Sequence, residues 1–170
     1  MRRLAPAILT LALAACGAGP PAVDAGGRTG GPTGAPPGPS PSPAPIGPSM
    51  SCGSVPVTIT YVPGGLSRGP RFGRIKSLTR PLEVHGLSWR GAGEELRVGV
   101  VCGVHSAERF ATLVTRSSLV AHHGKPALHW RTRGDVRNFM WLERPGTAVY
   151  VAATPGLARE LAEIADGVTP

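Results

Sequence analysis

The chain has 170 residues, of which 24 are glycine and 19 are proline, and its formal net charge is +8. A basic protein invites a nucleic-acid partner, but the arginines are scattered singly and aromatic residues make up only 5% of the chain, so few rings are available to stack on bases. We therefore expect no nucleic-acid partner and favour contact with an anionic surface.

The first 15 residues predict a lipoprotein signal peptide. Arg2-Arg3 precede a short apolar run that ends in Leu13-Ala14-Ala15-Cys16, with small residues at the cleavage point and cysteine directly after it. The apolar stretch from Leu4 to Ala15 holds about 12 residues and is interrupted by Pro6, whereas a membrane-spanning helix needs roughly 20. We expect cleavage before Cys16 and lipidation of its thiol, with palmitate among the acyl chains.

A lipidated Cys16 predicts a membrane-anchored protein on the outer face of the bacterial cytoplasmic membrane, with its domain facing the cell wall. Two or more acyl chains give stable anchoring, because each buried methylene contributes about 0.8 kcal/mol. The partners expected from this location are membrane lipid, through the anchor, and anionic envelope components such as lipid head groups or wall polymers.

Composition then divides the remaining chain into two parts. Residues 16–50 contain the lipidated cysteine and a Pro/Gly/Ser-rich tether that buries too little apolar surface to order itself, so we expect it to be disordered. Residues 51–170 are long enough for one extracytoplasmic domain with its own core.

Cys52 and Cys102 are the two cysteines left after Cys16 is committed to lipid. Two cysteines in an exported domain predict one disulfide. The alternative is a pair of reduced, buried thiols. The chain has no Cys-x-x-Cys motif, so thiol exchange has no support.

Most of the domain is predicted to form strands, because β-branched and polar residues alternate between turn residues. The expected strands are Val55–Tyr61, Leu96–Cys102, a hairpin of Leu119–Ala121 and Ala127–Trp130 around Gly124, and a hairpin of Asn138–Leu142 and Ala148–Ala152 around Pro145-Gly146. The stretch from Ser106 to Arg116 is compatible with either a helix or a strand.

The tail predicts a helix. Thr154 is a suitable N-cap, Pro155 suits the first turn and Gly167 suits the end. Three apolar residues fall on one face of it: Leu157, Leu161 and Ile164. We therefore predict an α+β fold, an antiparallel β-sheet with the C-terminal helix packed on one face.

Four short motifs resemble those of tethered bacterial extracytoplasmic domains of unknown function. They are Tyr61–Leu66 (Tyr-x-Pro-x-Gly-Leu), Gly124–Ala127 (Gly-Lys/Arg-x-Ala), Trp141–Gly146 with Val149–Val151 (Trp-x-x-x-x-Gly and the final strand), and Leu157–Val168 (the terminal helix). The composition, rich in Ala, Gly, Pro and Arg, is actinomycete-like. The resemblance implies an antiparallel sheet with a packed helix, and no catalytic residue carries over from it.

Three motifs suggest chemistry but have simpler explanations. Gly65–Gly69 matches the Gly-x-Ser-x-Gly nucleophile pattern, but the following Pro70 opposes the helix that this pattern needs, and we expect a turn. Arg133-Gly134-Asp135 is an integrin-type tripeptide at the position of an expected hairpin turn. The adjacent Glu94-Glu95 is expected to be a solvated pair of acids.

The five histidines, His85, His105, His122, His123 and His129, raise the question of a metal site. Zinc needs three or four converging ligands. On a strand, His122 and His123 would point to opposite faces, so that at most one could join any site. A turn at Gly124-Lys125 would pair His129 with Val120. We therefore expect no metal and no cofactor.

These observations favour a non-enzymatic envelope lipoprotein that presents a small binding or sensing domain. The alternative is a lipid or hydrophobic-ligand carrier with a cavity between sheet and helix, contacted by Trp141, Leu161 and Ile164. A third hypothesis is a small envelope hydrolase with an unrecognised site. The three tryptophans, Trp89, Trp130 and Trp141, are expected in the core, with an aromatic ligand cleft as the alternative.

Overall fold

The computed structural model describes residues 47–54 and 56–170. The predicted signal peptide, Cys16 and the predicted tether as far as residue 46 lie outside the described residues. Within the described part, no helix combines the length and the apolar character needed to cross a bilayer.

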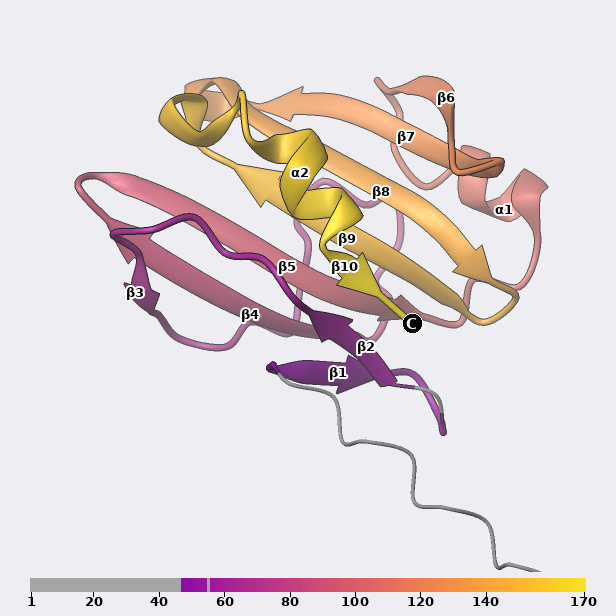
Figure 1. The fold of residues 1–170 in the computed structure, drawn as a ribbon. Helices are drawn as coiled ribbons and strands as arrows, with labels where there is room; N and C mark the ends of the chain where they lie inside the picture. The colour runs from indigo at the N-terminus through magenta and orange to yellow at the C-terminus, as the bar shows by residue number, and fades with distance from the viewer. Residues whose placement is uncertain (1–46, 55) are drawn as a thin grey trace, which may run out of the picture. The chain divides into compact units, whose positions relative to one another are not determined.

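A seven-stranded antiparallel sheet dominates the described part, with the strand order β3-β4-β5-β9-β8-β7-β6 (Figure 1). Its strands are β3 (Ser67–Arg68), β4 (Val84–Gly91), β5 (Glu94–Cys102), β6 (Ser118–His122), β7 (Lys125–Thr132), β8 (Val136–Arg144) and β9 (Thr147–Ala153). Both expected hairpins are present, as β6–β7 and β8–β9, and the predicted antiparallel sheet is confirmed.

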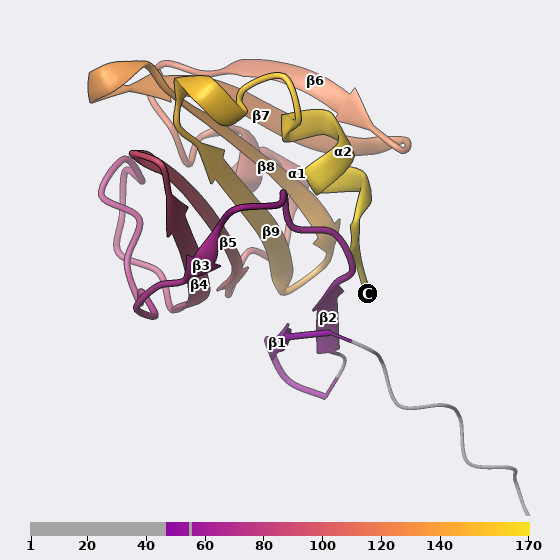
Figure 2. The ribbon, with the colours of Figure 1, turned by 60° about the vertical axis from the view of Figure 1, so that its left-hand side comes forward.

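A second, three-stranded antiparallel sheet brings the two ends of the described chain together (Figure 2). Its order is β1 (Ser49–Ser51), β2 (Pro56–Ile59) and β10 (Val168–Thr169). The strand β1 begins two residues before the predicted domain start at Ser51, and Met50 within it is buried. The packed part of the chain therefore extends slightly into the segment predicted as tether.

Helices are short, so the fold is mostly β rather than an even α+β mixture. The first, α1 (Ala107–Ala111), resolves the ambiguous stretch, and the Ser106 side chain caps it by accepting from the Arg109 N–H at 3.3 Å. The second, α2 (Leu161–Asp166), is the expected C-terminal helix.

The prediction of one continuous helix capped by Thr154 is wrong, whereas its end at Gly167 is confirmed. A separate 3-10 turn, Pro155–Leu157, precedes α2, and the Thr154 side chain makes no cap hydrogen bond because its hydroxyl contacts the strand β5 instead. Gly167 ends α2 as expected, with φ of −79° rather than the left-handed conformation common for glycine at this position.

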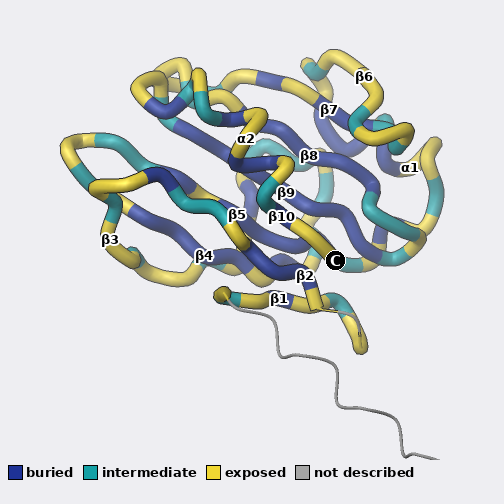
Figure 3. Tube along the Cα trace, viewed as in Figure 1, coloured by how far each residue is buried: buried dark blue, intermediate teal, exposed yellow. Residues whose placement is uncertain are grey.

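Both faces of the large sheet are covered, which explains its long buried strands (Figure 3). We call the two sides the α2 face and the α1 face. The α2 face packs against α2 and the small sheet, and its core includes Leu96, Val98, Trp141, Val151, Leu161 and Ile164. The α1 face packs against α1 and the segment 72–82, and its core includes Ile75, Val101, Phe110, Leu113, Leu128 and Met140.

The predicted disulfide is present. Cys52 and Cys102 are bonded, with their Cα atoms 5.4 Å apart and a sequence separation of 50. The bond ties the loop between β1 and β2 to the end of β5, so it links the small sheet to the large one.

Candidate functional site

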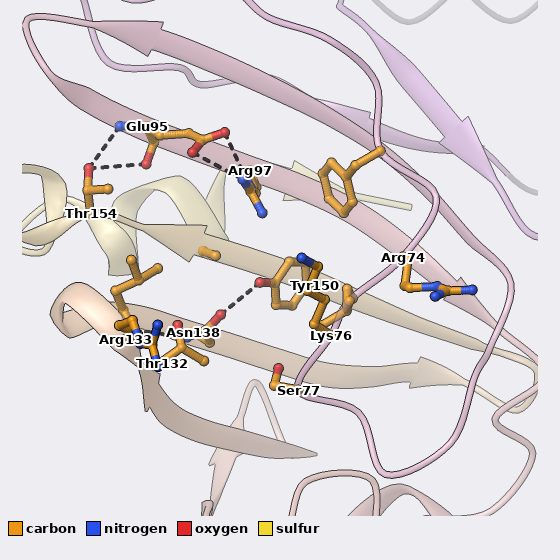
Figure 4. A pocket seen from close by; sticks show the side chains of 14 residues that line it. Arg74, Lys76, Ser77, Glu95, Arg97, Thr132, Arg133, Asn138, Tyr150 and Thr154 are labelled. Atoms are coloured by element: carbon orange, nitrogen blue, oxygen red, sulfur yellow. Dashed lines mark hydrogen bonds and ion pairs between the residues drawn. The ribbon is translucent and has the colours of Figure 1, made fainter.

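The α1 face contains a cavity of about 400 Å³, which we call the cationic pocket (Figure 4). It opens between the segment 72–77 and the strands β5, β8 and β9. Its charged lining residues are Arg74, Lys76, Glu95, Arg97 and Arg133, so four positive side chains surround one carboxylate.

The floor of the cationic pocket is a buried polar network. The Tyr150 hydroxyl donates to Asn138 Oδ1 at 2.7 Å, and Asn138 Nδ2 donates to the Val136 carbonyl at 2.9 Å and to the Thr132 hydroxyl at 3.2 Å. Burial raises the pKa of Tyr150 well above its ordinary value, so the phenol stays a neutral donor. A network with satisfied partners gives the pocket a rigid polar floor.

One wall of the pocket depends on two paired glycines. Gly86 on β4 is paired with Gly99 on β5, and the Phe72 ring lies over both residues. A Cβ atom at Gly86 would collide with this ring, and one at Gly99 would crowd it. The ring is thereby held edge-on to Tyr150, with 6.2 Å between ring centroids. The segment that carries Arg74 and Lys76 is therefore anchored beside the sheet.

The single carboxylate of the pocket is already neutralised. Glu95 accepts from Arg97 at 3.0 and 3.1 Å and from Arg90 at 3.0 and 3.2 Å. Burial raises the pKa of Glu95, but these arginine hydrogen bonds outweigh burial and lower the pKa overall. Two arginines on one carboxylate leave this corner of the pocket with a positive charge in excess.

The other three cations of the pocket are unpaired within the described part of the chain. Among residues 47–54 and 56–170, no acidic side chain forms an ion pair with Arg74, Lys76 or Arg133. Figure 4 labels Lys76 and Arg133 among the lining residues, together with Tyr150 and Asn138 of the polar floor. Both cations therefore line the same cavity as the polar floor.

Positive charge continues beyond the pocket. A neighbouring hollow of about 480 Å³ shares Asn138 and is lined by Arg116, Arg131 and Arg137. Of these, Arg131 forms an ion pair with Asp135 at 2.9 Å. The end of the sheet around the β7–β8 turn therefore presents a basic surface larger than the pocket itself.

The residues expected to contact a hydrophobic ligand do not all line a cavity. Trp141 and Ile164 are 2% and 0% exposed and fill the core between α2 and the sheet. Leu161 borders a groove of about 330 Å³ between α2 and β6–β8, together with Phe139 and His129. The space expected for a carrier is thus filled at its centre, and only its rim is open.

The other singled-out motifs mostly have structural explanations. Ser67 lies in the short strand β3, paired with Arg90, and no helix follows it. Arg133–Asp135 forms the expected turn between β7 and β8. All three tryptophans are buried in the core, as expected.

Glu94 and Glu95 are not the solvated pair that we expected. Glu94 accepts hydrogen bonds from the Thr154 hydroxyl and from the Gly156 N–H, the latter at 3.1 Å. Glu95 holds the two arginines described above. The residues diverge, as adjacent strand residues do, but each side chain has a structural partner.

The expectation that His122 and His123 point to opposite faces is wrong. The turn is His123-Gly124, one residue earlier than predicted, and both residues have positive φ, 48° and 75°. This conformation ends the strand alternation, so the two imidazole rings lie 4.2 Å apart, next to Asp166. The same shift pairs His129 with Ser118 rather than with Val120.

Sequence reasoning missed the residues of the cationic pocket. Arg74 and Lys76 lie in a segment without regular structure, and Arg133 lies in a turn. Arg97 alternates with buried valines on β5, which places it on the face opposite Leu96 and Val98 but names no partner. The signal available was the excess of arginine, which indicates an anion but not its location.

Comparisons with protein-family models, with curated proteins and with solved structures gave no match to this chain.

Proposed function

We propose that this protein is a non-enzymatic envelope lipoprotein whose domain binds an anionic component of the envelope in the cationic pocket. The observation that carries the proposal is the charge balance of the pocket. Arg74, Lys76 and Arg133 line the cavity without an acidic partner in the described part of the chain. The one carboxylate of the lining, Glu95, forms ion pairs with both Arg97 and Arg90.

Phosphate is the anionic group that best suits this lining. Guanidinium groups donate paired hydrogen bonds to phosphate or carboxylate oxygens, and a lysine ammonium adds a compact charge. The neutral Tyr150–Asn138 floor and the nearby hydroxyls of Ser77 and Thr132 supply uncharged polar contacts. A volume of about 400 Å³ accommodates a small headgroup or one unit of a polymer rather than an acyl chain.

The disulfide and the sequence of the amino terminus support the location. Disulfides persist in oxidising compartments outside the cytoplasm, where Cys52–Cys102 would be stable. The motif ending at Cys16 predicts the lipid anchor, and residues 16–46 are long enough to act as a spacer between membrane and domain. Mass spectrometry of a native membrane extract tests this part: an acylated amino-terminal Cys16 supports it, and an unprocessed Met1 contradicts it.

The binding test uses the full-length chain purified in non-ionic detergent and titrated with inorganic pyrophosphate in a calorimeter at low salt. The variant Lys76→Gln/Arg133→Gln removes two pocket charges. The control Arg109→Gln/Arg159→Gln removes two charges elsewhere, so both proteins have the same net charge.

We expect the pocket variant to bind pyrophosphate about tenfold or more weakly, because each charged hydrogen bond lost carries about 1.5–3 kcal/mol. The control variant should keep most of the affinity. Equal affinity in the two variants, or no binding to the unchanged protein, would overturn the pocket as the anion site.

A further inference from the structure

On the opposite face of the sheet, His122, His123 and Asp166 bring three potential ligand atoms together. Each side chain offers one such atom, and all three atoms lie within 4.8 Å of one another. His123 Nε2 and Asp166 Oδ1 are 2.9 Å apart. We propose that these three residues form a binding site for a divalent transition-metal ion such as Zn²⁺, independent of the cationic pocket.

The site is assembled from two elements far apart in sequence. The histidines come from the tip of the β6–β7 hairpin, and Asp166 is the last residue of α2. His123 and Asp166 are separated by 43 positions in the sequence. A metal ion held here would cross-link the edge hairpin of the large sheet to the C-terminal helix.

One ligand is held by packing and two are free to adjust. The His122 ring packs against Phe139 and Trp141, with centroid distances of 5.0 and 4.7 Å. The side chains of His123 and Asp166 are 66% and 58% exposed, so a hydrated ion can reach them. Metal–ligand bonds of about 2.0–2.2 Å require ligand atoms that lie closer together than the 4.8 Å limit of this cluster. Rotation of the exposed side chains can bring these atoms closer.

The ligand set selects the class of metal. Two imidazole nitrogens and one carboxylate oxygen suit Zn²⁺ and its neighbours Cu²⁺ and Ni²⁺, whereas Ca²⁺ and Mg²⁺ prefer sets made of oxygen alone. Three protein ligands leave a fourth position for water or for a donor atom of another molecule.

Asp166 supplies the negative charge of the site, although Arg137 and Arg159 line the same groove. Its Oδ1 lies 2.9 Å from His123 Nε2, at the carboxyl end of α2, where the backbone carbonyls are directed. The nearest lysine, Lys125, is held by Glu143 at 2.6 Å, so its charge is largely offset.

The described part of the chain holds one other cluster of possible metal ligands, and it lacks a third usable ligand. It consists of Glu83, His85 and Cys102. The Cys102 sulfur is bonded to Cys52, so it cannot act as a thiolate ligand. Only a histidine and a carboxylate remain there, which makes this cluster a useful control.

The experiment titrates the full-length protein, in detergent and stripped of metal with a chelator, with Zn²⁺ in a calorimeter at pH 7.5. Co²⁺ is added in a parallel titration, because its visible absorption bands report nitrogen and oxygen coordination. Test variants are His123→Asn, which tolerates the left-handed backbone, and Asp166→Asn, which keeps the shape of the side chain. The control is Glu83→Gln/His85→Gln.

We expect one Zn²⁺ per chain and a weakening of at least about tenfold in each test variant, since the loss even of groups that support metal ligands costs about 10–100-fold. The control should bind as the unchanged protein does, and the Co²⁺ bands should disappear in the test variants alone. Absence of binding, or equal loss in the control, would overturn the proposal. Far-ultraviolet circular dichroism that is identical among all proteins would show that the variants fold.

Discussion

The two faces of the large sheet both pack against a hydrophobic core, but they differ in how completely they are covered. On the α2 face, a helix and a small sheet close over Trp141 and Ile164, and polar groups remain at the edge. On the α1 face, the irregular segment 72–82 covers only part of the surface and leaves a charged pocket over a buried Tyr150–Asn138 pair.

The difference shows how one sheet can separate a packed core on one face from a charged pocket on the other. A strand residue on one face cannot contact the other face, because alternate side chains point in opposite directions. On β5, Leu96 and Val98 are fully buried on one side while Arg97 between them lies at the pocket on the other. Binding chemistry can therefore be carried on the α1 face without replacing residues that pack under α2.

Truncating a core residue on each face should give the largest effects. Phe110 from α1 and Ile164 from α2 are both 0% exposed. We expect Phe110→Ala to cost about 3–5 kcal/mol and Ile164→Ala about 2–5 kcal/mol, because each leaves a cavity in a close-packed core. Urea unfolding followed by tryptophan fluorescence measures both. If one substitution is nearly neutral, the corresponding face is not closed as described.

Removal of the disulfide tests how firmly the small sheet is attached to the α2 face. The variant Cys52→Ala/Cys102→Ala frees a loop of 50 residues, and the chain-entropy account assigns about 4 kcal/mol to such a cross-link. We expect a lower thermal unfolding temperature, with pyrophosphate affinity retained wherever the protein is folded. An unchanged unfolding temperature would show that packing alone holds the small sheet.

The variant Tyr150→Phe tests how much the buried polar network of the α1 face contributes to stability. The substitution removes the donor to Asn138 Oδ1 and leaves that buried acceptor without its 2.7 Å partner. We expect a loss of about 1–3 kcal/mol in the free energy of unfolding. Tyr61→Phe is the matched control, since the Tyr61 hydroxyl donates to Glu160 in a half-buried position. An equal loss of unfolding free energy in both variants would mean that burial does not strengthen the Tyr150–Asn138 hydrogen bond.

The smallest effect concerns two histidines at the edge of the α2 face, His122 and His129, whose imidazoles are partly desolvated. Burial lowers the pKa of His122 and of His129 from 6.5, so the unfolded chain binds more protons than the native one below that pH. The charged groups facing His122 are His123, Asp166, Lys125 and Glu143. We therefore expect stability to fall as pH decreases from about 6.5.

Urea unfolding with a metal chelator present, at pH 7.5 and pH 5.5, measures this dependence. The variant His122→Gln/His129→Gln should show a smaller difference in free energy between the two pH values. The same difference in both proteins would assign the dependence to other groups.

Several elements followed from the sequence because their signals are local. Alternation of β-branched and polar residues predicted β5, and the turns at Gly124 and Pro145-Gly146 predicted the hairpins β6–β7 and β8–β9. The strand β4 was missed as an element, although Trp89 within it was expected in the core. Its glycine and charged residues weaken the alternation.

The site was less predictable than the fold because its parts come from unrelated segments. Arg97 belongs to a strand, Lys76 to an irregular segment and Arg133 to a turn, and no spacing in the sequence links them. Likewise, a one-residue error in the β6–β7 turn was enough to misplace His123, because this residue belongs to the turn, where its positive φ ends the strand alternation.

By itself, the sequence determined the strand β5, the hairpins β6–β7 and β8–β9, the pairing of Cys52 with Cys102 and the approximate position of the last helix. These depend on residue periodicity, on turn residues or on Cys52 and Cys102 being the two cysteines of the predicted domain. Only the tertiary structure decided which cations share a pocket and that Asp166 meets the two histidines. Such contacts depend on strand order and on how α2 crosses the sheet, and both are set by packing between segments distant in the chain.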